Sequence, residues 1–389
     1  MTSVVLDARV VAGSGGGPDK TILNSPRFLE GGRYRMLCAY LRPPGDVGFA
    51  RLRERALAWG APLIEVDDRG ALDLGVIGRL IKICSRENVT IWHGHDYKTN
   101  LLGLILRPFW PMRLVTTVHG WGHETKKLLR YYAIDRLCLP RYERVLCVSD
   151  DLLVRCRALG IPEERCLPLI NGVDTNQFRR SRDRAEAKGR LGLPEDRLLI
   201  GAVGRLSDEK GFDLLIRALR RLVDAGLNAA VAIVGEGPER RALEALIAEL
   251  GLTGRAHLLG YRDDVVPVYE ALDIYALTSH REGLPNVVLE ALSLDLAVVA
   301  TRVAGVPTLI EDGRSGLLIE PGSIDELTRS LAELATDGDL RARLGSAGRV
   351  HVETKFSFAE RMRKLESIYD ALLGSSADLP RPVGVAARS

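Results

Sequence analysis

The chain has 389 residues, long enough for two domains of ordinary size, and its 39 glycines suit strands and helices joined by tight turns. The formal net charge is only +3, and no block of basic residues interleaved with aromatic ones appears. This composition argues against a nucleic-acid-binding protein, whereas it is compatible with an anionic ligand or a membrane surface.

Short apolar runs bounded by turn residues recur along the chain, and segments with helical periodicity follow several of them. The alternation predicts an α/β protein with two doubly wound parallel sheets, one in each half. The strands expected in the first half are residues 4–11, 35–41, 62–66, 89–92, 114–118 and 144–148. Those expected in the second half are residues 198–203, 229–234, 256–259, 274–277, 297–300 and 316–319. The clearest helices between them are residues 212–225, 239–250 and 324–335.

Composition also suggests where the domains begin and end. We expect a first domain over residues 1–173, a polar linker over 174–196 and a second domain over 197–355. A periodic helix, residues 356–373, is expected to return toward the first domain. The Gly/Ser/Pro-rich tail, residues 374–389, is expected to be disordered.

A glycine-rich loop, residues 13–20, follows the first expected strand. Ligands of open parallel sheets bind beyond the carboxyl ends of the strands, so loops in this position are candidates for function. Gly16 and Gly17 would let backbone N–H groups at a helix start approach a phosphate. Neither the dinucleotide fingerprint nor the Walker loop fits, because Pro18 replaces the third glycine and Lys20 has the wrong spacing. A flexible turn explains the loop equally well.

Polar residues follow three later strands of the first half. His119 directly follows an apolar strand, which makes it a better catalytic candidate than most single histidines. His93 and His95 form a His-x-His pair that suggests zinc, but no third ligand with suitable spacing is apparent, so metal binding is disfavoured. Ser149 and Asn171 close this half, where a cleft between two domains is expected.

In the second half, two cations stand in the loop after the strand at 198–203. Arg205 lies at the strand end and Lys210 lies just before a helix, a position from which both could neutralise a diphosphate. The alternative is a solvated loop in which Asp208 and Glu209 pair with these cations. Gly235, between a buried strand and a helix, permits either a tight turn or a close approach to a nucleotide.

The stretch HREGLPNVVLE, residues 280–290, places two glutamates on either side of a Gly-Leu-Pro turn. Pro285 is favoured as the first residue of a helix, so Glu282 would precede that helix and Glu290 would lie on its second turn. Both carboxylates would then border one pocket at the helix entrance. Two solvated glutamates are the alternative.

Taken in order, these motifs resemble those of the retaining, nucleotide-sugar-dependent glycosyltransferases of family four. In chain order, the motifs are the glycine-rich first loop, Val-His-Gly, Val-Ser, Asn-Gly-Val-Asp, Gly-Arg-Leu with Glu-Lys-Gly, Val-Gly-Glu-Gly-Pro, and Glu-Gly-Leu-Pro with its second Glu. They span positions 13–290, and the stretch AGVPTLIEDGRSGLLIEPG, residues 304–322, continues the pattern, so the resemblance covers nearly the whole chain. The resemblance implies the GT-B architecture, in which two Rossmann-like domains face each other.

The resemblance also implies a role for each matching residue of the second domain. Glu290 would accept hydrogen bonds from the donor's ribose hydroxyls, and Glu282 would contact the transferred sugar. The N–H groups of Gly283 and Leu284 would turn toward the sugar and the diphosphate. The cations that would hold the diphosphate are Arg205 and Lys210.

In the first domain, the resemblance places Gly16 and Gly17 against the diphosphate and His119 near the anomeric side of the sugar. The remaining residues of the implied substrate-binding set are Ser149, Asn171, Gly204 and Gly235. Two positions depart from the family pattern. Asp295 stands where a Gly-x-Pro usually begins, and Thr308 replaces a glutamate that supports the donor pocket.

No metal or other cofactor is expected. An Asp-x-Asp motif at a strand end would indicate a divalent ion, whereas the one at residues 337–339 lies between helical segments. Cations and a helix N-terminus meet the leaving group's charge instead, and such preorganised stabilisation is usually the largest catalytic contribution. Retention by front-face substitution, with the leaving phosphate taking the acceptor's proton, is implied by the family alone.

The acceptor is expected to be a glycan or a lipid-linked glycan met by the first domain. Residues 123–145 mix basic residues with leucines and tyrosines, which is typical of a surface that docks on anionic lipid or of an ordinary amphipathic helix. No apolar run approaches the ~20 residues of a membrane span, and the start lacks the order of a signal peptide. Six cysteines without Cys-x-x-Cys spacing are typical of reduced thiols. We therefore expect a cytoplasmic protein, at most peripheral at the inner face of the membrane.

The favoured function is transfer of a hexose from a UDP- or GDP-sugar. A nucleotide-sugar 2-epimerase of similar architecture and a non-catalytic nucleotide-sugar-binding protein are the alternatives. The combination of Glu282 and Glu290 with Arg205 and Lys210 favours the transferase.

Overall fold

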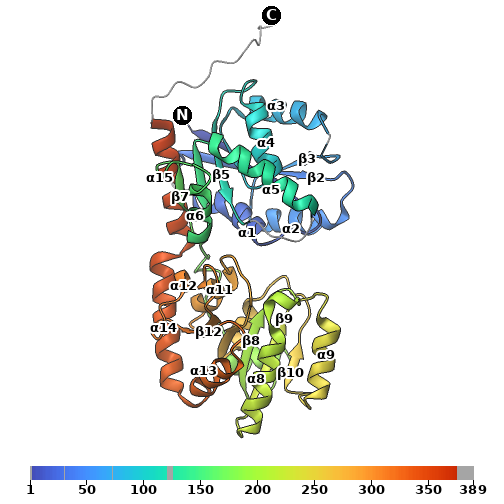
Figure 1. Ribbon diagram of the computed structural model, residues 1–389, viewed down its shortest axis with the longest axis vertical. Coiled ribbons are helices and arrows are strands. Elements are labelled where there is room, and N and C mark those ends of the chain that lie inside the picture. The colour runs from blue at the N-terminus through green and yellow to red at the C-terminus, as the bar shows by residue number, and fades with distance from the viewer. Residues whose placement is uncertain (1, 30, 72, 121–125, 375–389) are drawn as a thin grey trace, which may run out of the picture. The chain divides into compact units, whose positions relative to one another are not determined.

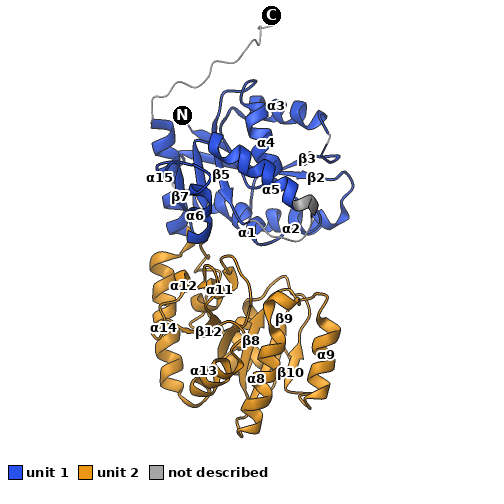
Figure 2. Ribbon diagram, viewed as in Figure 1, with its two compact units in different colours: residues 1–171, 359–389 blue, residues 172–358 orange. Residues whose placement is uncertain are grey.

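The computed structural model describes residues 2–29, 31–71, 73–120 and 126–374, and the side chains of 126–128 are outside this description. The chain forms two compact units (Figure 2). Unit 1 contains residues 1–171 and 359–389, and unit 2 contains residues 172–358. The expected tail, 374–389, lies outside the described residues except for Gly374.

Unit 1 is built on a seven-stranded sheet whose order is β3-β2-β1-β4-β5-β6-β7. Strands β2, β3, β5 and β7 of this sheet are labelled in Figure 1. All of its neighbouring strands pair in parallel, as predicted. The strands are β1 (Ser3–Val10), β2 (Tyr34–Arg42), β3 (Leu63–Asp67), β4 (Val89–Gly94), β5 (Arg113–Val118), β6 (Arg144–Cys147) and β7 (Cys166–Pro168). The short edge strand β7 was not expected from the sequence.

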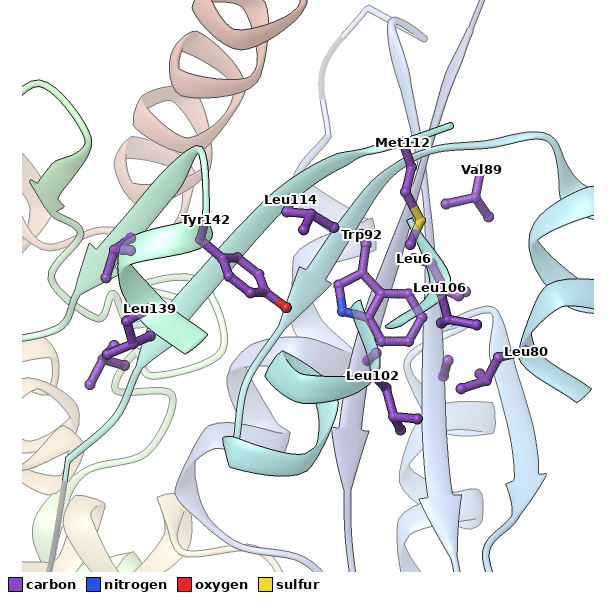
Figure 3. Close-up of a cluster of buried hydrophobic side chains, with 14 of the residues drawn as sticks. Leu6, Leu80, Val89, Trp92, Leu102, Leu106, Met112, Leu114, Leu139 and Tyr142 are labelled. Carbon is purple, nitrogen blue, oxygen red and sulfur yellow. The ribbon is translucent and has the colours of Figure 1, made fainter. Parts of the chain in front are cut away.

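The helices of unit 1 alternate with its strands. They are α1 (Gly17–Asn24), α2 (Ala50–Ala58), α3 (Gly75–Glu87), α4 (Tyr97–Leu106), α5 (Lys126–Cys138), α6 (Asp150–Arg157) and α15 (Phe358–Gly374). Buried side chains from strands and helices form one continuous core around Trp92 (Figure 3). The Trp92 indole N–H donates to the Thr99 carbonyl at 3.1 Å, so this large ring is buried without an unpaired polar atom.

Helix α15 belongs to unit 1 although its residues come last in the chain. The Tyr34 hydroxyl donates to Asp370 at 2.6 Å, and the Arg33 guanidinium donates to Glu366 at 2.7 Å. The Tyr369 hydroxyl lies 2.7 Å from His93 Nδ1, deep in the core of the unit. The last helix therefore completes a unit that the first residues begin.

Unit 2 contains a six-stranded parallel sheet of order β10-β9-β8-β11-β12-β13. Its strands are β8 (Leu198–Val203), β9 (Ala229–Val234), β10 (Ala256–Leu258), β11 (Ile274–Leu277), β12 (Ala297–Thr301) and β13 (Leu317–Ile319). Its helices are α7 (Arg184–Arg190), α8 (Phe212–Asp224), α9 (Arg240–Glu249), α10 (Val266–Ala271), α11 (Asn286–Ser293), α12 (Val306–Leu309), α13 (Ile324–Thr336) and α14 (Gly338–Lys355). Their apolar faces bury a second core against the sheet.

The segment expected as a linker, residues 174–196, contains helix α7 and lies within unit 2. Several of its polar side chains bind buried groups of this unit, whereas others, such as Arg179, Glu186 and Arg190, are exposed. The Glu270 carboxylate is fully buried and accepts hydrogen bonds from the Ser181 hydroxyl at 2.7 Å and from Arg182 at 2.8 Å. Lys188 donates to Asp273 at 2.9 Å.

The structure also bears on the expectations for membrane-spanning helices and for the six cysteines. Across the described residues, no helix combines the length and apolar character needed to cross a membrane. All six cysteines are buried and unbridged, and the fold brings Cys147, Cys156 and Cys166 together although they looked scattered.

Candidate functional site

In unit 2, the loop after β8 and the loop after β11 are joined by a partly buried ion pair. Lys210 Nζ donates to Glu282 Oε1 at 2.7 Å, and the Ser279 hydroxyl donates to the same oxygen at 2.6 Å. Their side chains are 20% and 8% exposed, respectively. The Thr278 hydroxyl also donates to the Lys210 carbonyl at 2.9 Å. Two candidates 72 positions apart are therefore held in contact at the same edge of the sheet.

Gly211 explains how the two loops come so close. It caps helix α8 at φ 58°, the left-handed region that favours glycine. A Cβ atom at this position would lie 2.4 Å from the Thr278 carbonyl oxygen. Lys210 is thus placed directly before the N-terminus of α8, where the helix dipole favours negative charge.

Arg205 differs from Lys210 in its surroundings. Its side chain is exposed, and within the described part of the chain its guanidinium has no ion-pair partner. Glu209 lies 3.9 Å from Arg281 instead, and Lys210 binds Glu282. The alternative, in which Asp208 and Glu209 would pair with Arg205 and Lys210, is therefore not what the structure shows.

Glu290 is buried on the second turn of α11, and its carboxylate accepts a hydrogen bond from the Tyr269 hydroxyl at 2.9 Å. Pro285 is the N-cap residue of this helix rather than its first residue. The turn before this helix is held by a hydrogen bond from the loop after β12, because the Gly283 carbonyl accepts from Gly305 N–H at 3.0 Å. Gly283 is exposed and Leu284 is partly exposed at the helix entrance.

Gly235 has a packing explanation that requires no ligand. It adopts φ 148°, and a Cβ atom there would lie 1.8 Å from the Gly204 carbonyl oxygen, so this glycine allows the ends of β8 and β9 to approach. Gly204 has no such requirement, because a Cβ atom there would come no closer than 3.3 Å to the Phe212 ring. Asp295, which departs from the family's glycine, adopts φ 57° and so keeps the backbone conformation that glycine favours.

In unit 1, Gly16 and Gly17 form the start of helix α1. Gly16 N–H donates to Asp19 at 2.5 Å, and Asp19 is further held by Arg9 at 2.7 Å. Among the residues that the structure describes, none has an atom within 4 Å of a Cβ atom built at either glycine. Unlike Gly235, these two positions are not required to be glycine by the packing of the protein.

Ser149 and Asn171 lie in different surroundings. The Ser149 hydroxyl caps helix α6 by accepting from Leu152 N–H at 3.5 Å, which is a structural role. Asn171 is buried, and among the described residues its side-chain oxygen has no hydrogen-bond partner.

A chain of buried polar groups leads to His119. His95 Nδ1 lies 2.9 Å from His119 Nε2, and His95 Nε2 contacts Asp7 Oδ1. Both ring pairs are stacked, with centroids 4.6 Å apart for His93 and His95 and 5.3 Å apart for His95 and His119. Asp7 was not among the residues predicted from the sequence. It lies in strand β1, and an aspartate in an otherwise apolar strand is a signal for a buried polar contact.

These surroundings set the charge of each group. Burial lowers the pKa of His93 to about 3 and holds the pKa values of His95 and His119 well below the usual 6.5, so the rings are neutral. Burial raises the pKa of Asp7 to about 6, opposed by His93 and Arg361. Because the three rings are neutral, one hydrogen sets the pattern of the whole chain. If it lies on His95 Nε2, His119 Nδ1 is an acceptor, and if it lies on Asp7, His119 Nδ1 is a donor.

The fold supplies the third potential ligand that the sequence did not reveal. Ligand atoms of Asp7, His93 and His95 lie within 4.8 Å of one another. Each ring nitrogen already has a partner, however. His93 is bound by the hydroxyls of Tyr369 and Thr117, both at 2.7 Å, and His95 is bound on both sides. Every ring nitrogen of His93 and His95 therefore belongs to a hydrogen-bonded network.

We expect acidification from pH 7 to pH 5 to destabilise unit 1. The folded pKa of His93 is depressed, so the unfolded chain binds a proton below pH 6.5 that the folded one does not, which costs about 2 kcal/mol at pH 5. The folded pKa values of His95 and His119 are also depressed, so these two residues likewise lower the stability as the pH falls. Asp7, whose folded pKa is raised to about 6, opposes them by about 1 kcal/mol as the pH falls from 7 to 5. Calorimetric melting at pH 7 and at pH 5 measures the net loss of stability. His93→Asn should make this loss between the two pH values smaller. An equal melting temperature at both pH values would contradict this account.

Comparison with known proteins places both units in one family. The model described as Glycosyltransferase Family 4 matches residues 27–177, and the model described as Glycosyl transferases group 1 matches residues 183–351. The D-inositol 3-phosphate glycosyltransferase of Saccharomonospora viridis is 31% identical over 301 residues, covering 71% of this chain and 69% of that protein. The diphosphoundecaprenol α-1,3-galactosyltransferase of Escherichia coli, which is named for UDP-Gal and α-D-GlcNAc, is 26% identical, covering 76% and 79%.

Among solved structures, Anabaena HepE in complex with UDP superposes with a TM-score of 0.78 at 20% identity, covering 95% of this chain and 100% of HepE. HepE has also been solved with UDP-glucose, with a TM-score of 0.77 and 21% identity over 96% of this chain and 100% of HepE. At this identity the likeness shows the fold, which is the expected GT-B fold.

Proposed function

Because the chain belongs to the group 1 glycosyl transferases of family 4, we propose that it moves a hexose from a UDP- or GDP-sugar to a glycan or lipid-linked glycan acceptor. The contact between Lys210 and Glu282 is the observation that carries the proposal. It combines, at one point, a cation suited to phosphate and a carboxylate suited to sugar hydroxyls.

In the proposed donor complex, the Lys210 ammonium binds the diphosphate beside the N-terminus of α8, and Arg205 adds a second positive charge. Glu282, no longer the main partner of Lys210, accepts hydrogen bonds from the sugar. Glu290 binds the ribose. The buried position of Glu290 favours this role, because a carboxylate in a site with little water discriminates strongly for a partner that donates hydrogen bonds.

We propose that this reaction needs neither a metal ion nor another cofactor. The charge that develops on the leaving diphosphate is met by Lys210, by Arg205 and by the α8 N-terminus, which together replace the role of a divalent ion. The acceptor hydroxyl attacks the anomeric carbon on the face that the diphosphate leaves, and its proton passes to the departing phosphate oxygen. His119, held by His95 at 2.9 Å, positions the sugar during this step.

The names of the relatives support the choice of substrates. HepE was solved with UDP and with UDP-glucose, which favours a uridine nucleotide as donor. The E. coli relative is named for a diphosphoundecaprenol acceptor, which favours a lipid-linked glycan.

Slow hydrolysis of the donor tests the proposal without knowledge of the acceptor. Purified protein is incubated in EDTA with UDP-, GDP- and ADP-sugars, and the nucleoside diphosphate released is measured by chromatography. We expect one donor to be hydrolysed by the wild type and not by Glu282→Ala. If every donor remains intact, calorimetric titration with the same panel separates strict acceptor dependence, in which one donor binds, from a function outside this class, in which none binds. Formation of an epimerised sugar without acceptor would contradict the transferase.

A further inference from the structure

A large apolar cavity lies in unit 1 at the carboxyl-terminal edge of the sheet. Its volume is about 880 Å³, within the range of ~300–1,000 Å³ typical of sites for small ligands. Its walls come from the ends of β1 and β2, from the segment that follows β3 and from helices α4 and α5. No residue of the predicted donor site lines it.

One face of helix α4 forms the apolar wall of this cavity. Tyr97, Leu101 and Ile105, spaced by four residues, all line it, and Leu101 is 38% exposed. The helix also packs into the core through Leu106 and through Leu102, which borders both the core and the cavity (Figure 3). A helix that is apolar on both faces is normally buried on both, so the cavity-facing side is suited to an apolar ligand.

The charged groups beside the cavity are mostly neutralised within unit 1. Lys98 Nζ donates to both Asp68 carboxylate oxygens at 2.6 Å, and Asp73 is paired with Arg79 at 2.5 Å. Arg69 also lines the cavity and is exposed, and over the described ranges its guanidinium has no ion-pair partner. One positive charge therefore remains at an apolar cavity, which is complementary to an anionic head on a hydrocarbon chain.

The cavity lies next to the histidines. Tyr97 follows His95 by two residues, and Asp96 between them accepts a hydrogen bond from Val10 N–H at 2.7 Å. Val10 itself lines the cavity. A chain bound there would have its head group at the same edge of the sheet as His119.

We propose that this cavity binds the hydrocarbon chain of a lipid-linked acceptor, with Arg69 on the phosphate that follows the chain. The inference rests on the proposed glycosyl transfer and names the class of its acceptor. A concave cavity with apolar walls suits a slender, flexible chain better than the surface of a folded partner, which needs a broad and flatter area.

Prenyl diphosphates of increasing length test the proposal. Inorganic pyrophosphate and the C5, C10 and C15 prenyl diphosphates are titrated into the full-length protein by calorimetry, with UDP in excess to occupy the donor site. Each buried methylene is worth about fourfold in affinity, so a C5 unit should strengthen binding by more than about tenfold even if only two of its carbons are buried. Affinity that is the same for pyrophosphate and for all three chains would overturn the proposal.

Three variants locate the binding. Leu101→Asp places a charge on the cavity wall and should weaken C15 binding by about tenfold or more, with pyrophosphate unaffected. Leu57→Asp is the matched control, because Leu57 is exposed on α2 outside the cavity and should leave C15 binding unchanged. Arg69→Gln should remove the preference for the C15 diphosphate over the C15 alcohol. Equal losses in Leu101→Asp and Leu57→Asp would overturn the assignment.

Two controls separate this inference from the proposed function and from another occupant. UDP titrated into the same preparations reports the donor site: retained UDP binding without chain-length dependence would refute the cavity proposal alone. Chain-length dependence without binding of any nucleotide would support the cavity while refuting the donor assignment. Sedimentation measures the oligomeric state, and a wild-type dimer that Leu101→Asp dissociates would show that a second copy covers the cavity, which overturns the proposal.

Discussion

Alanine in place of Lys210 should lower the turnover number by about 10²–10³-fold, the usual cost of removing one preorganised group that stabilises developing negative charge. Its ammonium contacts Glu282 at 2.7 Å and stands directly before the α8 N-terminus, so it is already in place before the donor arrives. Because the charge on the diphosphate grows as the glycosidic bond breaks, turnover should fall more than donor affinity does.

Steady-state kinetics and calorimetry with the UDP-sugar measure the two effects separately for Lys210→Ala. Arg281→Ala is the matched control, since this neighbouring cation is 76% exposed and lies 3.9 Å from its partner Glu209. It should leave both quantities nearly unchanged. A Lys210→Ala enzyme that lost only donor affinity would show that this lysine binds the ground state and the transition state equally.

Glu290→Ala should weaken nucleotide binding by about 100-fold, whereas His119→Ala should leave binding intact and lower turnover. A hydrogen bond to a charged group contributes ~1.5–3 kcal/mol, and the ribose offers two hydroxyls to the buried Glu290 carboxylate. His119, by contrast, is assigned to the sugar near the reacting carbon, where positioning affects the rate.

The buried surroundings of Glu290 require a control for folding. Its removal leaves the Tyr269 hydroxyl without this acceptor, at a cost of ~1–3 kcal/mol in stability. Tyr269→Phe removes the same hydrogen bond but keeps the carboxylate, so it should retain UDP binding. Calorimetry with UDP on all three variants decides the roles. Equal losses of binding in Glu290→Ala and His119→Ala would refute the distinction between them.

The sheets were predictable because parallel strands are buried on both faces and therefore appear as continuous apolar runs. Strands β8 and β9 have the bounds that the sequence predicts, Leu198–Val203 and Ala229–Val234. The three residues of β7, Cys166–Pro168, carry no such pattern, because an edge strand of this length has neither an apolar run nor an alternation to detect.

The candidate site could be predicted only in part. Motifs located Lys210 and Glu282 on loops that follow strands, and the fold brings the two into contact. A motif does not distinguish a glycine that a ligand approaches from one that the backbone approaches, and Gly235 is of the second kind. Tyr369 contacts His93 across 276 positions of sequence, a separation at which local periodicity carries no information. The binding roles of all these residues remain predictions.

The position of helix α15 has a consequence for how the protein is made. The strands of unit 1 leave the ribosome first, but Arg361 and Tyr369, which face the buried Asp7 and His93, are synthesised only after residues 172–358. At ~5–20 residues per second, about 10–40 s pass in between. During that interval the nascent unit 1 carries a buried carboxylate and imidazole that lack their final partners. A product truncated before α15 never acquires them, so unit 1 is completed only after the whole of unit 2 has been synthesised.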